Sequence, residues 1–141
     1  MRHLSYMVLA SIAVLGCNRS AEAPKVATLP VKGTVTLDGK PLSGAQVVFL
    51  TGVPPTIFVG TTDDQGAYQL QGMESSLQGE CKVTISQMLK PDGSPPAPGE
   101  PPAMAGATEQ LPSKYSQLDA TTLSAEVGAE GGTFDFALES K

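Results

Sequence analysis

Short runs in which apolar and polar residues alternate, separated by turn residues, are the feature that most constrains how this chain can fold. In residues 31–38, Val31, Gly33, Val35 and Leu37 fall on one side of an extended chain, and polar residues fall on the other. Side chains of a β-strand point alternately to its two faces, so the pattern predicts a strand with one buried face. Comparable segments predict strands at 45–50, 57–62, 67–70, 81–86, 122–127 and 133–138.

Turn residues lie between these segments and set the fold class. Asp38-Gly39, residues 63–66 and Gly131-Gly132 are typical of tight turns. About seven short strands with such spacing and no amphipathic helix predict an all-β domain, either a sandwich or a barrel. Strands that are half polar suit two packed sheets, each with one wet face. We therefore expect an antiparallel β-sandwich over residues 31–141, with 45–50, apolar on both sides in its later half, as a central strand.

One long segment cannot be part of this pattern. Residues 90–112 hold seven of the twelve prolines of the chain, with Gly93, Gly99 and Gly106 among them. Proline lacks the amide hydrogen that helices and sheet ladders need, so neither a helix nor a strand is expected here. The composition predicts a long polyproline-like loop, either a spacer or a surface that a partner recognises.

The first residues form a separate segment with the features of an export signal. Basic residues (Arg2, His3) precede an apolar stretch from Leu4 to Leu15, and the small residue Gly16 stands before Cys17. The stretch is shorter than the ~20 residues that cross a bilayer. With Val14 three places before the cysteine, residues 14–17 resemble the lipobox of bacterial lipoproteins, the alternative being an ordinary secretory signal.

The lipobox resemblance implies cleavage between Gly16 and Cys17 and acylation of Cys17. Residues 1–16 would then be a signal peptide, and residues 17–30, polar and small, a tether between lipid and domain. We expect a cell-envelope protein anchored by lipid, facing the periplasm or the cell surface. Asn18 after the cysteine suggests the outer membrane, by the sorting rule of some bacteria.

The composition of the remaining chain excludes several function classes. Without Arg2, eight basic residues face fourteen acidic ones, and the single remaining arginine, Arg19, lies in the tether. Nucleic-acid binding needs clustered positive charge, so we expect no nucleic-acid partner. The single histidine, His3, leaves with the signal, which removes His-based nucleophilic pairs and His-containing zinc sites. We predict no cofactor.

Two aspartates form the sole weak candidate for a metal site. Asp63 and Asp64 could begin a calcium loop, because Ca²⁺ takes several oxygen ligands. Asp-x-x-Gly is also an ordinary turn, in which the aspartate bonds to nearby backbone and glycine takes a positive φ. The turn is the preferred interpretation because the strand predicted at 67–70 interrupts any calcium loop.

Two further residues could carry chemistry but have simpler structural explanations. With Cys17 acylated, Cys81 is the remaining thiol, so no disulfide within the chain is available. It shares a face with Val83 and Ile85, which predicts a small buried side chain rather than a reactive one. Tyr115, preceded by Lys114, could bind a ligand, but we expect it to pack where the proline-rich loop returns to the sandwich.

Several patches resemble carboxypeptidase-regulatory-like (transthyretin-like) β-sandwich domains, and a group of small bacterial lipoproteins built on them. The opening of that family resembles residues 31–45, its second hairpin residues 62–70 and the next strand residues 79–86. Residues 111–116 and 133–138 resemble the end of those lipoproteins. Cys81 departs from the family pattern, which has an aromatic residue there. The resemblance implies the fold but carries no functional residues.

Together these patterns predict a membrane-anchored binding or structural module that is not an enzyme. Its partners would be the membrane, through the lipid, and an envelope protein or a polysaccharide. Two alternatives stay open. A small hydrolase-like enzyme could pair carboxylates for acid–base catalysis, with Asp38, Asp63, Asp64 and Asp135 as candidates. A carbohydrate-binding module is the other, although such modules usually expose aromatic residues and the chain has no tryptophan.

Overall fold

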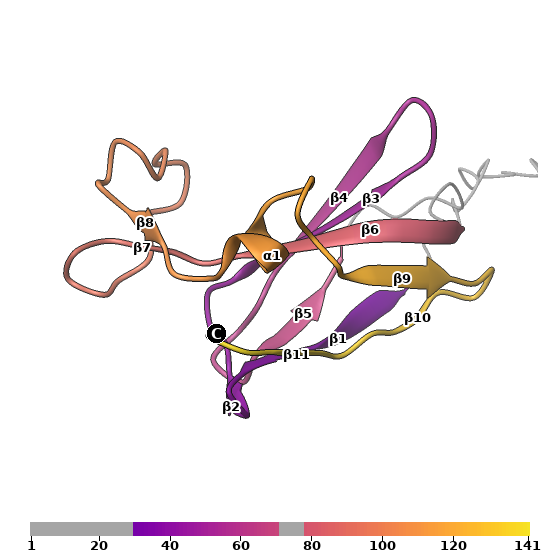
Figure 1. Ribbon diagram of the computed structural model, residues 1–141, viewed down its shortest axis with the longest axis horizontal. Helices are drawn as coiled ribbons and strands as arrows, with labels where there is room; N and C mark the ends of the chain where they lie inside the picture. Colours follow the sequence, from indigo (N-terminus) through magenta and orange to yellow (C-terminus); the bar gives the residue numbers. More distant parts are fainter. Residues whose placement is uncertain (1–29, 71–77) are drawn as a thin grey trace, which may run out of the picture.

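The computed structural model describes residues 30–70 and 78–141, which form two layers of β-sheet (Figure 1). The predicted signal peptide, the signal residues Gly16 and Cys17, and the predicted tether up to residue 29 lie outside the described residues. Strands are the main regular structure of the described chain, which has one short helix, so the expected all-β class is confirmed. Within residues 30–70 and 78–141, no helix is long and apolar enough to cross a membrane.

One layer is a four-stranded antiparallel sheet. Its strands follow the order β4 (Thr56–Thr61), β3 (Gln46–Thr51), β6 (Gly79–Ser86) and β9 (Ser124–Val127). Strand β3 pairs with β4 along one side and with β6 along the other. The prediction of a central strand at 45–50 is therefore confirmed.

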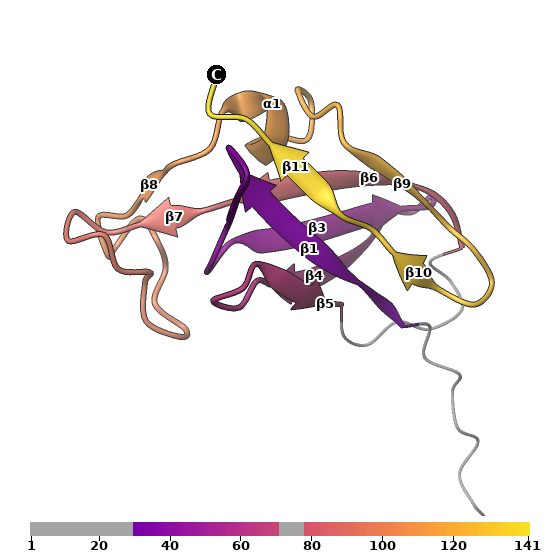
Figure 2. The same ribbon diagram turned by 90° about the horizontal axis from the view of Figure 1, so that it is seen from below.

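The second layer is built around β1 (Val31–Leu37). One edge of β1 pairs antiparallel with β5 (Ala67–Gln69) and then with β2 (Lys40–Pro41), and its other edge pairs with β10 (Gly132–Thr133) and β11 (Phe136–Leu138). The pairing of β1 with β10 and β11 is parallel, as the arrows of β1 and β11 in Figure 2 show. The expectation of a purely antiparallel sandwich is wrong at this edge. The chain leaves β9 in the other sheet and joins β1 at its beginning, where the Gly132 amide donates to the Pro30 carbonyl at 3.0 Å, so both strands run the same way.

The strand predicted at 133–138 is interrupted in its middle. The Phe134 amide donates to the Lys32 carbonyl, and the Asp135 carboxylate then accepts hydrogen bonds from the amide and the hydroxyl of Thr34, both at 2.8 Å. The Phe134 carbonyl lies so close to β1 that a Cβ on Gly33 would be 1.7 Å from its oxygen. The side chain of Asp135 thus replaces a regular backbone hydrogen bond between the two strands. Position 33 must be glycine because the Phe134 carbonyl leaves no room for a Cβ.

The predicted turn at Asp38-Gly39 is present and links β1 to the short strand β2. Both residues have positive φ, 50° and 79°, as a two-residue hairpin turn of type I′ requires. The two-residue strand β2 itself had no signal in the alternation pattern, since Lys40 and Pro41 are both exposed.

The core lies between the two layers and has an aromatic cluster at its centre. Phe49 of β3 is fully buried, and its ring lies 6.0–6.3 Å, centre to centre, from the rings of Tyr68, Phe134 and Phe136. The Tyr68 hydroxyl donates to the Phe134 carbonyl at 2.7 Å, which satisfies the polar end of a buried side chain. Burial, with the charge of Asp135 as a lesser cause, holds the pKa of Tyr68 well above its ordinary value. These rings fasten the last strand of the chain to the facing sheet.

Three small elements lie between β6 and β9. They are β7 (Met88–Leu89), β8 (Thr108–Glu109) and the single helical turn α1 (Ser113–Ser116). Strand β8 falls inside the segment 90–112, where no strand was expected, and it pairs with β7. The prediction fails there because residues 103–111 contain no proline, so their amides can join a ladder.

Candidate functional site

Residues 88–109 leave the sandwich at one end and are called here the proline-rich excursion. Figures 1 and 2 show it projecting from the end of β6, away from β10 and the start of β1 at the other end of the molecule. None of residues 90–110 is buried. Binding surfaces usually occur on loops held by a rigid scaffold, so this end of the sandwich is the candidate site.

The excursion consists largely of hydrogen-bonded turns. In its first part the Lys90 amide donates to the Ser94 carbonyl at 2.8 Å. The Asp92 carboxylate accepts from the Ser94 amide and hydroxyl, and these bonds lower the pKa of Asp92. In its second part, amides of residues 104, 105 and 107 donate to the carbonyls of Pro101 and Pro102. Proline carbonyls thus serve as acceptors in turns, although the rings remove donors.

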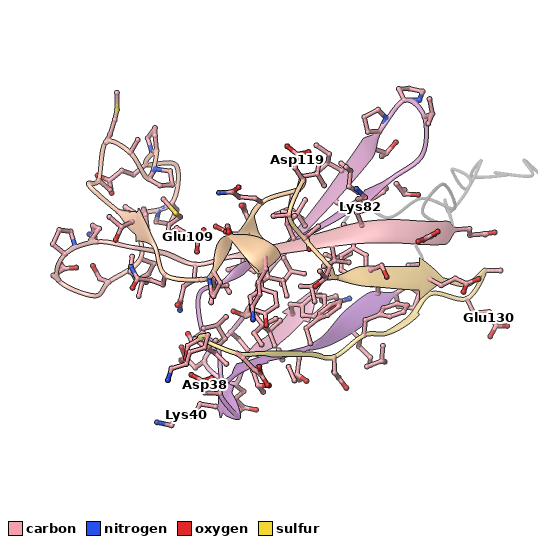
Figure 3. The ribbon with its side chains drawn as sticks, viewed as in Figure 1. Asp38, Lys40, Lys82, Glu109, Asp119 and Glu130 are labelled. Carbon is pink, nitrogen blue, oxygen red and sulfur yellow. The ribbon has the colours of Figure 1, made fainter. Side chains whose placement is uncertain are left out.

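Glu109 fixes the base of the excursion to the sandwich, and Figure 3 shows it at this junction. One carboxylate oxygen accepts the backbone amides of Gln87, Gln110 and Leu111 at 2.9–3.0 Å. The other accepts the hydroxyl of Ser86 at 2.5 Å. Hydrogen bonds to an ionised group are the stronger kind, so this one side chain holds both strands of the excursion where they leave the sheet.

A groove of about 580 Å³ lies between the excursion and the end of the four-stranded sheet. The sheet contributes polar but uncharged side chains to it, and the excursion contributes proline rings and a methionine. Its lining residues are Gly44, Gln46, Thr61, Ser86, Met88, Pro95, Pro96, Pro98, Gly99 and Pro102. None of them is charged. Such a surface suits a neutral ligand or a partner segment with an apolar face and a few hydrogen-bonding groups.

The predicted place of Cys81 is confirmed. Its side chain is fully buried beside Val83 and Ile85, while Lys82 points away from the other sheet (Figure 3). Burial raises the pKa of the Cys81 thiol, and a hydrogen bond with Thr51 opposes that shift. A thiol with a raised pKa in an apolar core has little of the reactive thiolate form near neutral pH.

Asp63 and Asp64 both lie in the turn between β4 and β5. The Asp63 carboxylate accepts the backbone amides of Gln65 and Ala67, both at 2.9 Å, and Gly66 has a φ of 74°. The Asp64 carboxylate accepts the Ser43 hydroxyl at 3.2 Å. The Asp63 carboxylate therefore accepts backbone hydrogen bonds within the turn, as the turn interpretation predicted. Among residues 30–70 and 78–141, no group of three or more His, Cys, Asp or Glu side chains is arranged to hold a metal ion.

The other two carboxylates considered for catalysis lie elsewhere. Asp38, at the β1–β2 turn, accepts the Ser140 amide at 3.1 Å, and hydrogen bonding to Ser140 lowers the pKa of Asp38. Asp135 is bonded to Thr34, as described above. Each of the four aspartates thus has a different hydrogen-bond partner, and Asp38 and Asp135 lie outside the turn that holds Asp63 and Asp64.

Tyr115 lies where the chain returns from the excursion, as expected. It is on helical turn α1, it is buried, and its hydroxyl accepts the Glu139 amide at 3.2 Å. The Lys114 ammonium lies 4.9 Å from the centre of the Tyr115 ring and also donates to the carbonyl of Lys141. The ring therefore packs the return of the excursion against the C-terminal residues.

Sequence reasoning missed Glu109 and the groove. Nothing in the local pattern distinguishes the half-buried Glu109 from the other acidic residues, because its partners Ser86 and Gln87 lie 23 and 22 residues earlier. The proline cluster predicted a loop, but the groove that it forms with Gln46 and Thr61 depends on how the excursion folds back.

Comparisons with known proteins identify no relative. No protein-family model, no curated protein and no solved structure matches the chain.

Proposed function

We propose that this protein is a lipid-anchored lipoprotein of the cell envelope whose β-sandwich is a binding module without catalytic activity. The proline-rich excursion and its groove are the contact surface in this proposal. The observation that carries it is the position of the excursion, at the end of the sandwich opposite the start of β1. A tether that joins the domain at residue 30 would leave the excursion directed away from the membrane.

The chemistry of the groove supports a partner with an uncharged contact segment. Proline rings offer flat apolar surfaces, and Gln46, Thr61 and Ser86 offer amide and hydroxyl groups. Polysaccharide recognition usually relies on exposed aromatic rings. The aromatic residues of the described chain are buried or half-buried. An envelope protein therefore fits this surface better than a polysaccharide does.

The sandwich type is part of the same proposal. The resemblance of residues 31–45, 62–70 and 79–86 to carboxypeptidase-regulatory-like domains agrees with the two-layered all-β architecture. Cys81, where that family has an aromatic residue, is accommodated as a buried side chain in the core.

The lipid anchor is tested at Cys17. The native protein should partition into detergent and should begin at an acylated Cys17, as mass spectrometry of the intact protein would show. A Cys17→Ser variant should remain uncleaved or become soluble. A native mature terminus at any other residue, without lipid, would overturn the anchor.

The contact surface is tested by crosslinking in the native envelope, followed by mass spectrometry. In the key variant, Asn-Gly replaces residues 90–107, so that Leu89 and Thr108 are joined by a two-residue hairpin turn. Capture of the partner should fall strongly with this variant and partly with Glu109→Gln, which weakens the base of the excursion. Glu126→Gln on the distant strand β9 is the control and should capture normally. Equal capture by all three variants would exclude the excursion as the contact surface.

The absence of catalysis is tested with ester, peptide and glycoside substrates, with and without Ca²⁺ or Zn²⁺. The purified chain should show no turnover. Reproducible turnover that is lost in Asp63→Asn or Asp135→Asn would favour the hydrolase alternative.

A further inference from the structure

Strand β4 ends the four-stranded sheet, and among the residues that the structure describes its outer edge lacks the usual protection. In the described part of the chain it pairs with β3 along one side, and no strand pairs with its outer side. Natural edge strands are generally short, charged or interrupted by proline, because an open row of amides and carbonyls invites another strand. The opposite edge strand, β9, is four residues long and carries Glu126. Strand β4 has six residues, none of them charged and none of them proline.

The water-facing side of β4 is also apolar. Ile57 is 60% exposed and Val59 is 41% exposed. Their direct neighbours on β3 are Leu50 and Val48, which are half-buried on the same face. These four side chains form an aliphatic patch at the edge of the sheet, whereas the charged side chains of this face, Glu80, Lys82 and Glu126, lie on β6 and β9.

We propose that β4 pairs with β4 of a second copy of this chain, antiparallel and about a two-fold axis. The core side of each sheet must stay on the same side after pairing, so opposed residues must share a face. In the register that centres on Phe58, Ile57 of each copy lies opposite Val59 of the other. Both exposed aliphatic residues then gain a cross-strand apolar neighbour, twice by symmetry.

Charge is the reason to choose a second copy as the occupant. The chain carries a net charge of −5, so two copies can associate only where they do not bring acidic side chains together. Residues 52–62 contain no charged side chain, and this register places Asp63 opposite Val53 at the exposed tip of the β3–β4 hairpin. Two acidic molecules can therefore join at this edge without placing like charges opposite each other.

The inference does not depend on the proposed function, since it uses neither the lipid nor the excursion. A single pair of six-residue strands forms a small interface. Small interfaces give weak, concentration-dependent association.

The test follows the mass of the full chain in mild non-ionic detergent by native mass spectrometry over a range of concentrations. The wild-type chain should form a dimer whose share rises with concentration. The double variant Ile57→Lys, Val59→Lys should weaken dimerisation by about tenfold or more, because lysines would face each other in both symmetric pairs. The double variant Ile57→Glu, Val59→Glu should do the same.

Mixing the two variants distinguishes edge pairing from a general loss of folding or solubility. In an equimolar mixture, lysine of one copy faces glutamate of the other, so a mixed dimer should form. The double variant Ser124→Lys, Glu126→Lys on strand β9 is the control and should dimerise like the wild type. Circular dichroism should show the same β content in all variants, because every substituted side chain is exposed.

Three results would overturn the proposal. The first is a wild-type chain that stays monomeric at every concentration. The second is a dimer that the β9 substitutions disrupt as strongly as the β4 substitutions do. The third is a mixture of the lysine and glutamate variants that forms no mixed dimer.

Discussion

The sandwich and the proline-rich excursion differ in what holds them together. The sandwich buries an aromatic cluster between two hydrogen-bonded sheets, and its buried hydrophobic residues lie before residue 86 or after residue 110. The excursion buries none of residues 90–110 and relies on local turns and on Glu109 at its base. Stability and surface presentation are therefore separate in this molecule, and changes in one region should leave the other largely intact.

The largest expected effect comes from removing the ring at the centre of the sandwich. Phe49→Ala should lower the free energy of unfolding by about 3–5 kcal/mol, because it leaves a cavity that three neighbouring rings cannot fill. Met104→Ala in the excursion is the matched control, because the Met104 side chain is 84% exposed. It should change the free energy of unfolding by less than about 0.5 kcal/mol. Urea denaturation measures both. Similar losses for the two variants would remove the distinction between the regions.

Gly33→Ala tests the close approach between the first and last strands. The added Cβ would overlap the Phe134 carbonyl, so the backbone must move, and a loss of about 3 kcal/mol is expected. Gly128→Ala is the control, since its nearest contact would be an ordinary 3.9 Å to the Gly131 carbonyl. If the unfolding curves of the two variants coincide, Gly33 can be replaced without strain.

Cys81→Ser tests the packing of the core against the four-stranded sheet, where Cys81 lies on β6. It should cost about 1–3 kcal/mol, because a hydroxyl group replaces a thiol in an apolar setting. In the wild-type chain, Cys81 should react with thiol reagents only after denaturation, with the Cys81→Ser variant as the blank. Rapid labelling of the folded protein would place Cys81 at the surface.

Replacing residues 90–107 by Asn-Gly should have a smaller effect on stability. The β7–β8 pairing and the bonds of Glu109 remain, so the free energy of unfolding should change by less than about 1 kcal/mol, as for other loop-length changes. Hydrogen exchange of β3 and β6 should stay slow. Unfolding of the sandwich in this variant would mean that the excursion stabilises the core.

The smallest expected effect is a matched pair of acid titrations. The pKa values of Asp38 in the sandwich and Asp92 in the excursion are both lowered by hydrogen bonds. Each ionised group therefore favours the folded form above the unfolded pKa of ~3.9, and this contribution is lost as the pH falls through the lowered folded pKa. Asp38→Asn should reduce the acid sensitivity of global unfolding, whereas Asp92→Asn should change only hydrogen exchange within the excursion. Identical pH profiles for both variants in both measurements would contradict this.

Local patterns predicted the parts of the fold that depend on local rules. Alternation located β1, β3, β6 and β9, and turn residues located the hairpin at Asp38-Gly39, because side-chain direction and φ are properties of a few neighbouring residues. The break between β10 and β11 depends on a bond between Asp135 and Thr34, which are 101 residues apart. The function of Glu109 likewise depends on residues of another strand. A pattern of a few neighbouring residues cannot show contacts between residues that are far apart in sequence. The parallel pairing of β1 with β10 and β11 was not predicted for the same reason.

That parallel pairing has a consequence for how the chain is made. The first strand of the domain has the last strand as its neighbour, so one edge of its sheet stays open until Phe136–Leu138 have been synthesised. Contacts between such distant residues form late and slow the folding of a domain. A chain emerging from the ribosome therefore cannot complete this sheet until residues 136–138 have appeared. Loss of Phe136–Leu138 would leave the second half of β1 without a partner along that edge.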